Sequence, residues 1–217
     1  MGKKIGVVLS GCGVSDGAEI HESVVTLLAI DRHGAEAVMC APNIDQLHVV
    51  NHLTGEVEEG ATRNVLVESA RIARGAIRDV VEVSADELDA LILPGGFGAA
   101  KNLCDFAVSG AGCSVDPGVA DLVRAIHTQG KPVGAVCIAP ALIAKVLGEE
   151  KPELTIGNDA ETAGALASMG ASHVDCPVTE FVVDRDRKLV TSPAYMLAQS
   201  ISEAAEGIEK TVAAVID

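Results

Sequence analysis

Short apolar runs alternate with segments of helical period along the chain, and this alternation restricts the possible folds more than any other feature. The apolar runs predict strands at 5–9, 36–41, 90–93 and 132–136, and the periodic segments predict helices at 19–32, 62–74, 119–128, 141–147, 159–169 and 196–215. Strands that alternate with helices are typical of βαβ units, which build a mostly parallel sheet with helices on both faces. The sequence therefore predicts an α/β sandwich of three layers.

Two segments depart from this alternation. Residues 181–184 and 189–191 flank a charged tetrapeptide, which predicts a small β-hairpin. Residues 44–60 show no clear period, so we expect an insertion or a long excursion from the sheet. Because no linker, repeat or low-complexity tract interrupts the chain, we expect residues 1–217 to form a single domain.

The charge balance excludes several classes of partner. Sixteen Lys and Arg against 31 Asp and Glu give a formal net charge of −15, the opposite of the basic surface that binds nucleic acid or anionic lipid. The longest apolar run, 132–144, is interrupted by prolines and shorter than the roughly 20 residues that span a bilayer. The first ten residues do not have the pattern of a secretion signal. We therefore expect a cytoplasmic protein with no nucleic-acid or membrane partner.

The cysteine and histidine spacing gives no metal site. The six cysteines form no C-x-x-C pair and no cluster with histidine. His48 and His52 are spaced as neighbours on a helix would be, but no third ligand follows at a suitable distance. We expect no bound metal.

One cysteine occupies a position suited to catalysis. In open α/β sheets ligands bind beyond the carboxyl ends of the strands. There the apolar strand 132–136 runs into Cys137-Ile138-Ala139-Pro140 and a helix begins at once, as at a nucleophile elbow with Cys in place of Ser. The positive end of that helix is expected to lower the pKa of the Cys137 thiol and favour the thiolate. A buried structural cysteine is the alternative interpretation.

Two further strand ends can complete such a site. The loop Pro94-Gly95-Gly96 lets backbone N–H groups approach a ligand, and with the N–H of Ile138 it predicts an oxyanion hole. Glu19 and Glu22 lie in the first turn of the first helix, from which one carboxyl can reach the neighbouring strand ends. Taken alone, an acidic residue there is most often solvated and favourable to the helix dipole.

Other residues near the strand ends are candidates for substrate contacts. Cys12 follows the first strand, His21 is adjacent to Glu22, and Lys101 and Asn102 follow the glycine loop. Each has an ordinary structural explanation as well, such as a solvated histidine or a helix cap. Tyr195, the one tyrosine, can reach the site or a partner subunit.

These motifs, in this order, carry a family resemblance. Residues 5–22, 50–56, 92–103 and 191–199 resemble the PfpI-type branch of the class I amidotransferase-like superfamily, and within it the ElbB group named for isoprenoid biosynthesis. The resemblance covers essentially all 217 residues. It implies a flavodoxin-like fold, a homodimer, and a site without a cofactor.

The resemblance also implies residue roles and an activity. By motif position, the nucleophile falls on Cys137, its acidic partner on Glu22, and the oxyanion donors on Gly95, Gly96 and Ile138. The activity implied for the ElbB group is that of a glyoxalase, which converts glyoxal to glycolate. A small α-oxoaldehyde is then the expected substrate. The chain departs from many relatives at 153–158, where they place a histidine, and at 192–195, where glutaminase members carry His-x-Glu.

The absence of these histidines bears on the choice between three functions. Glutamine hydrolysis is disfavoured because no histidine is in line to take the thiol proton, unless His21 or His173 serves. A glyoxalase needs only the cysteine and a glutamate whose pKa is raised by burial. The alternative is a non-enzymatic or redox-sensing protein that uses Cys137 as an oxidation sensor.

Overall fold

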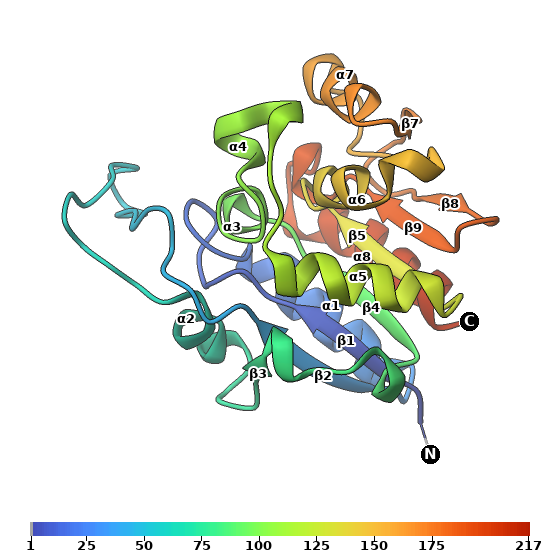
Figure 1. Ribbon diagram of the computed structural model, residues 1–217, viewed down its shortest axis with the longest axis horizontal. Helices are drawn as coiled ribbons and strands as arrows, with labels where there is room; N and C mark the ends of the chain where they lie inside the picture. Colours follow the sequence, from blue (N-terminus) through green and yellow to red (C-terminus); the bar gives the residue numbers. More distant parts are fainter. Residues whose placement is uncertain (1) are drawn as a thin grey trace.

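A seven-stranded sheet forms the centre of the molecule in the computed structural model, which describes residues 2–217 (Figure 1). In sheet order its strands are β3 (Arg78–Asp79), β2 (Glu36–Ala41), β1 (Lys4–Val8), β4 (Ala90–Leu93), β5 (Val133–Val136), β9 (Leu189–Ser192) and β8 (Val182–Asp184). Neighbouring strands are parallel except for β8 and β9, which are antiparallel. The carboxyl ends of β1, β4 and β5 therefore meet at one edge of the sheet.

Helices cover both faces of this sheet (Figure 1). One face packs against α1 (Ile20–Arg32), α2 (Val65–Ile72) and α8 (Ile201–Ile216), and the other against α5 (Pro117–Thr128) and α6 (Pro140–Leu147). Along β4, Leu91 and Leu93 join the apolar cluster under α5 and α6, while Ile92 joins the cluster under α1 and α8. The predicted three-layer, flavodoxin-like sandwich is confirmed.

Short elements complete the chain. They are α3 (Phe97–Lys101), α4 (Phe106–Ser109), α7 (Ala160–Ser168), β6 (Glu153–Leu154) and β7 (Ser172–His173). The last two pair in parallel as a separate small sheet. The sequence did not predict this sheet, because a strand of two residues shows no period. The predicted hairpin is present as β8 and β9, and β9 also belongs to the main sheet because it pairs with β5.

Two helices begin well after their predicted starts. Helix α2 begins at Val65 rather than near residue 62, because the Asn64 side chain caps it by accepting the N–H of Val67. Helix α8 begins after the N-cap Ser200, while residues 194–196 form a separate 3₁₀ turn. In that turn Ala194 has a positive φ of 43°, which an α-helix does not permit.

The apolar stripe of α1 faces outward. Ile20, Val24 and Leu28 share one face of this helix and are 43, 49 and 41% exposed. The buried face carries mostly small and polar residues, namely Glu22, Ser23, Thr26, Ala29 and Ile30. The helix thus directs a carboxylate, not its most apolar stripe, at the sheet.

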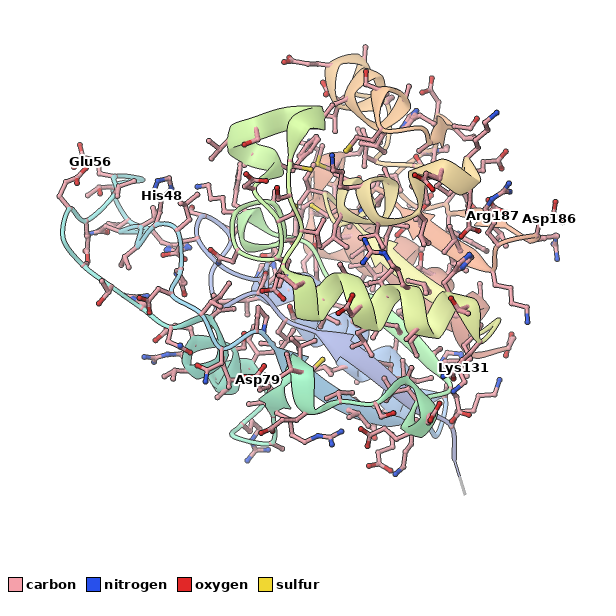
Figure 2. All side chains as sticks on the ribbon, in the orientation of Figure 1. His48, Glu56, Asp79, Lys131, Asp186 and Arg187 are labelled. Atoms are coloured by element: carbon pink, nitrogen blue, oxygen red, sulfur yellow. The ribbon has the colours of Figure 1, made fainter. Side chains whose placement is uncertain are left out.

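The segment 44–60 extends from the body of the molecule, as predicted for an excursion. Figure 2 labels His48 and Glu56 on this extension. It is an irregular hairpin closed by hydrogen bonds from Asn51 N–H to the Glu56 carbonyl at 2.9 Å and from Glu58 N–H to the Val49 carbonyl at 2.8 Å. No helix within residues 2–217 combines the length and apolar character needed to cross a membrane.

Candidate active site

Cys137 sits in a sharp turn between β5 and α6. Its φ is +60°, in the left-handed region that costs a residue with a side chain about 1 kcal/mol or more. Two hydrogen bonds hold the turn: Cys137 N–H donates to the Ser192 carbonyl at 3.0 Å, and Ala139 N–H donates to the Val136 carbonyl at 3.1 Å. This is the strand, strained turn and helix of a nucleophile elbow.

Glu22 reaches the same place from the first turn of α1. Glu19 caps that helix, because its carboxylate accepts the N–H of Glu22 at 2.7 Å. The Glu22 side chain is fully buried. Its Oε2 accepts the N–H of Gly95 at 2.9 Å and its Oε1 accepts the N–H of Tyr195 at 3.2 Å. Backbone groups from two distant segments therefore fix both carboxylate oxygens.

Gly95 lies between the cysteine and the glutamate. A Cβ atom at this position would lie 2.4 Å from Cys137 Cβ, 3.0 Å from Cys137 Sγ and 2.8 Å from Glu22 Oε2. No side chain fits there. Glycine in the loop after β4 is therefore required for the close approach of the thiol and the carboxylate.

The electrostatics of Glu22 match a group that exchanges protons near neutral pH. Burial raises the pKa of its carboxyl to about 7, and the nearby charge of Glu19 adds to this. Hydrogen bonds from Tyr195 N–H, the Cys137 thiol and Gly95 N–H oppose the shift but do not cancel it. The raised pKa expected for Glu22 is confirmed.

The Cys137 thiol does not have the low pKa expected from the helix terminus. Burial and the Glu22 carboxylate raise its pKa well above the ordinary value. The N–H groups of Gly96 and Ile138 hydrogen-bond the sulfur and lower the pKa, but burial outweighs them. The thiol is protonated at neutral pH and donates a hydrogen bond to Glu22.

The backbone donors divide into two roles. The N–H groups of Gly96 and Ile138 point at the sulfur, where an oxyanion formed by attack of Cys137 would lie. The N–H of Gly95, placed by sequence reasoning in the same hole, instead donates to Glu22. Gly95 thus holds the carboxylate.

A pocket of about 460 Å³ opens above Cys137. Most of its lining is apolar, and its polar groups are few. The lining residues are Val14, Glu19, Gly96, Phe97, Ala100, Phe106, Ala107, Cys137, Ile138, Thr162, Tyr195 and Met196. The pocket gives a small molecule access to a thiol that is otherwise buried.

The four other candidate contacts do not line this pocket. Lys101 Nζ donates to the Ser15 carbonyl at 3.0 Å and lies 4.9 Å from the centre of the Phe97 ring. The buried Asn102 amide donates to two carbonyls of the loop after β1 and accepts the N–H of residue 47. Cys12 is partly exposed on the loop between β1 and α1.

Neither histidine that could serve as a base meets the thiol. His21 Nδ1 lies 2.8 Å from the Tyr195 hydroxyl, and His173 Nε2 accepts the N–H of Ile156 at 3.3 Å. Within the described residues, 2–217, the pocket lining contains no histidine. The same part of the chain holds no group of three or more side chains suited to bind a metal.

Sequence reasoning named Glu19 and Tyr195 near the site without their observed roles, and it missed Phe97 and Val14. Tyr195 holds Glu22 through its backbone N–H, which no side-chain pattern reveals. Glu19 caps α1 and lines the pocket, although its position equally suits a solvated helix start. Phe97 and Val14 are 53 and 42% exposed at the pocket. Phe97 directly follows the glycine loop, a position that could have indicated its role.

The chain is similar in sequence to one known family and to proteins from other organisms. The pattern of the DJ-1/PfpI family matches residues 12–203. The human "Glutamine amidotransferase-like class 1 domain-containing protein 3, mitochondrial" is 45% identical over 99% of this chain and 82% of its own length. The zebrafish "ES1 protein, mitochondrial" is 33% identical over 88% of this chain and 76% of its own length.

Solved structures agree on the fold. An Ehrlichia chaffeensis isoprenoid biosynthesis protein with an amidotransferase-like domain superposes with a TM-score of 0.91 and 36% identity, covering 98% of both chains. Drosophila melanogaster DJ-1beta superposes with a TM-score of 0.58 and 21% identity, covering all of this chain and 91% of its own. The second likeness shows the fold alone.

Proposed function

The chain belongs to the DJ-1/PfpI family, which includes enzymes and non-enzymes, and from this premise we propose that it is a glyoxalase that needs no cofactor. Its substrate is a small α-oxoaldehyde such as glyoxal, and its product is a 2-hydroxy acid such as glycolate. One observation carries the proposal: a buried Glu22, whose pKa is raised to about 7, accepts a hydrogen bond from the Cys137 thiol. Such a pair can move protons at neutral pH without a histidine.

The first step joins the thiol to the aldehyde. The sulfur of Cys137 bonds to the carbonyl carbon, and the thiol proton passes to Glu22. The carbonyl oxygen becomes an alkoxide beside the N–H groups of Gly96 and Ile138, which stabilise its charge. Return of the proton from Glu22 to the alkoxide gives a neutral hemithioacetal. The step changes no net charge and needs no oxidant or reductant.

The second step moves a proton between the two carbons. The Glu22 carboxylate removes the hydrogen of the carbon bonded to sulfur and returns a proton to the neighbouring carbon. The hydroxyl proton of the first carbon passes to the oxygen of the second. The first carbon is thereby oxidised to a thioester and the second is reduced to an alcohol, so protons and electrons balance within the substrate. Water then cleaves the thioester, releasing the 2-hydroxy acid and restoring the thiol of Cys137.

The other two functions have less support. Redox sensing requires an exposed thiol of low pKa, whereas Cys137 is buried and its pKa is raised. Glutamine hydrolysis by a Cys-His-Glu triad requires a histidine beside the thiol, and His21 and His173 are instead hydrogen-bonded to Tyr195 and Ile156. The word "amidotransferase-like" in the relatives' names describes those proteins, not the activity of this chain.

A homodimeric state and a cytoplasmic location are part of the same proposal. The exposed apolar stripe of α1, formed by Ile20, Val24 and Leu28, supports a homodimer, since such a stripe is favourable when covered. The cytoplasmic location stays a prediction, and the human and zebrafish relatives are named as mitochondrial proteins.

The test is glyoxal consumption together with glycolate formation by the purified protein at neutral pH, without added metal or thiol. We expect turnover by the native protein and by a Cys176→Ala variant, whose thiol is buried outside the pocket. Cys137→Ala and Glu22→Gln should each lose at least about 100-fold in kcat/KM. Equal rates in the native protein and Cys137→Ala would refute the proposal.

A further inference from the structure

The pocket above Cys137 is much larger than glyoxal. Its volume of about 460 Å³ lies within the roughly 300–1,000 Å³ of pockets that bind drug-sized ligands. Glyoxal has four non-hydrogen atoms, which fill only the end of the pocket beside the thiol. Most of the pocket would then hold water against apolar side chains, an arrangement that does not contribute to binding.

The walls are built from apolar side chains on both sides. Val14 and Phe97 form one wall and are joined by a hydrogen bond from Phe97 N–H to the Val14 carbonyl at 2.8 Å. The Lys101 ammonium packs on the Phe97 ring at 4.9 Å. Phe106 and Ala107 of α4 form another part of the lining. Three aromatic residues, Phe97, Phe106 and Tyr195, therefore line the pocket in a chain that has only four Phe and Tyr residues.

The charge of the pocket excludes an anionic substituent. Within residues 2–217, Glu19 is the one acidic residue that lines it, and no Lys or Arg lines it. An anion would meet the Glu19 carboxylate, while the ammonium of Lys101 lies outside the lining and donates to the Ser15 carbonyl. The chemistry of the lining fits a neutral, apolar group.

Resting on the proposed function, we infer that the preferred substrate is an α-oxoaldehyde with a bulky apolar substituent, of the size of a phenyl or branched alkyl group. The aldehyde lies at Cys137, Gly96 and Ile138, and the substituent fills the space between Phe97 and Phe106. Phe97, Phe106 and Ala107 then determine specificity. Burial of the substituent raises kcat/KM because its apolar surface leaves water when the transition state forms.

The test compares phenylglyoxal with glyoxal. We expect kcat/KM of the native protein to be at least about tenfold higher for phenylglyoxal, as burial of a few methylene equivalents allows. Ala107→Phe places a ring in the pocket from an exposed position on α4, and should lower the ratio of the two kcat/KM values at least about tenfold. This change in ratio is independent of the intrinsic reactivity of the two aldehydes.

Val108→Phe is the matched control. Val108 is the next residue of α4, is 69% exposed and does not line the pocket. It receives the same ring, so its ratio should equal that of the native protein. A native ratio below one, or equal ratios in the Ala107 and Val108 variants, would overturn the inference.

A binding measurement separates this inference from the proposed function. If no aldehyde is turned over, the glyoxalase proposal fails, and the pocket is then examined by calorimetry with mandelate and glycolate as unreactive ligands of Cys137→Ser. Mandelate binding at least about tenfold tighter than glycolate would support the apolar specificity of the pocket even so. Equal binding of the two acids would overturn it.

Discussion

Replacement of Glu22 by Gln should change how stability depends on pH. The ordinary pKa of the carboxyl is 4.5, and in the folded protein burial raises it to about 7. A carboxyl with a raised pKa stabilises the folded state fully below the ordinary value, and this contribution is lost as the pH rises through about 7. Between pH 5 and pH 8 the titration of Glu22 should therefore lower the free energy of unfolding of the native protein by about 2.5 kcal/mol. The Glu22→Gln variant has no such group and should not show this loss.

The Gln side chain of the variant also lowers the free energy of unfolding by an amount that does not depend on pH. Both oxygens of Glu22 accept backbone N–H groups, from Gly95 and Tyr195. A Gln side chain has one acceptor, so one of these buried donors loses its partner at a cost of about 1–3 kcal/mol at every pH. Glu22→Gln should thus be the less stable protein at pH 5, and the deficit should shrink or reverse by pH 8.

Urea unfolding at fixed protein concentration, from pH 5 to pH 8, measures this difference. Glu161→Gln is the matched control, since it makes the same chemical change on an exposed residue of α7. Its difference from the native protein should stay within about 0.5 kcal/mol across the range. A pH-independent difference for Glu22→Gln would refute the argument, because it would mean that Glu22 titrates alike in the folded and unfolded protein.

Three further outcomes follow from the structure. Gly95→Ala should reduce kcat/KM for glyoxal at least about 100-fold, because its Cβ would lie 2.4 Å from Cys137 Cβ; a circular dichroism spectrum like that of the native protein would show that the fold survives. The kcat/KM profile should rise with pH and level off above about 7, as the Glu22 carboxylate becomes available to take the thiol proton, and a profile that falls through this range would contradict that role. Asn102→Ala should lower the free energy of unfolding by about 2–4 kcal/mol, measured in urea, since its buried amide makes three hydrogen bonds between loops; a loss below about 0.5 kcal/mol would contradict this.

The sequence predicted the parts of the fold that local pattern determines. The strands β1, β4 and β5 are apolar because helices cover both of their faces, and this gives continuous apolar runs that are easy to recognise. The elbow at Cys137 was predictable for the same reason, since an apolar strand ends there and a helix follows at once. Both features depend on neighbours in the sequence.

The hydrogen bonds that complete the site were not predictable in this way. Gly95 lies 73 residues from Glu22 in the sequence, and Tyr195 lies 173 residues away. Each contributes a backbone N–H, a group that every residue other than proline possesses. Only the assembled sheet edge shows which N–H groups reach the carboxylate, and their positions explain why Gly95 holds Glu22 rather than an oxyanion.

The outward direction of the apolar stripe of α1 also depends on the hydrogen bonds of the site. Residues of an α-helix are 100° apart, so Ile20 lies about 200° around the helix axis from Glu22, nearly on the opposite side, and Val24 and Leu28 follow close to Ile20. Burying the Glu22 carboxylate therefore turns the apolar stripe outward, and no rotation of the helix can bury both. The periodicity of the sequence is correct but cannot choose between the two faces, because the choice depends on the hydrogen bonds that Glu22 makes at the sheet edge. The exposure of the stripe is thus a consequence of the site, and a second copy of the chain that covers it would restore burial while also holding the first turn of α1, and with it Glu22, in place.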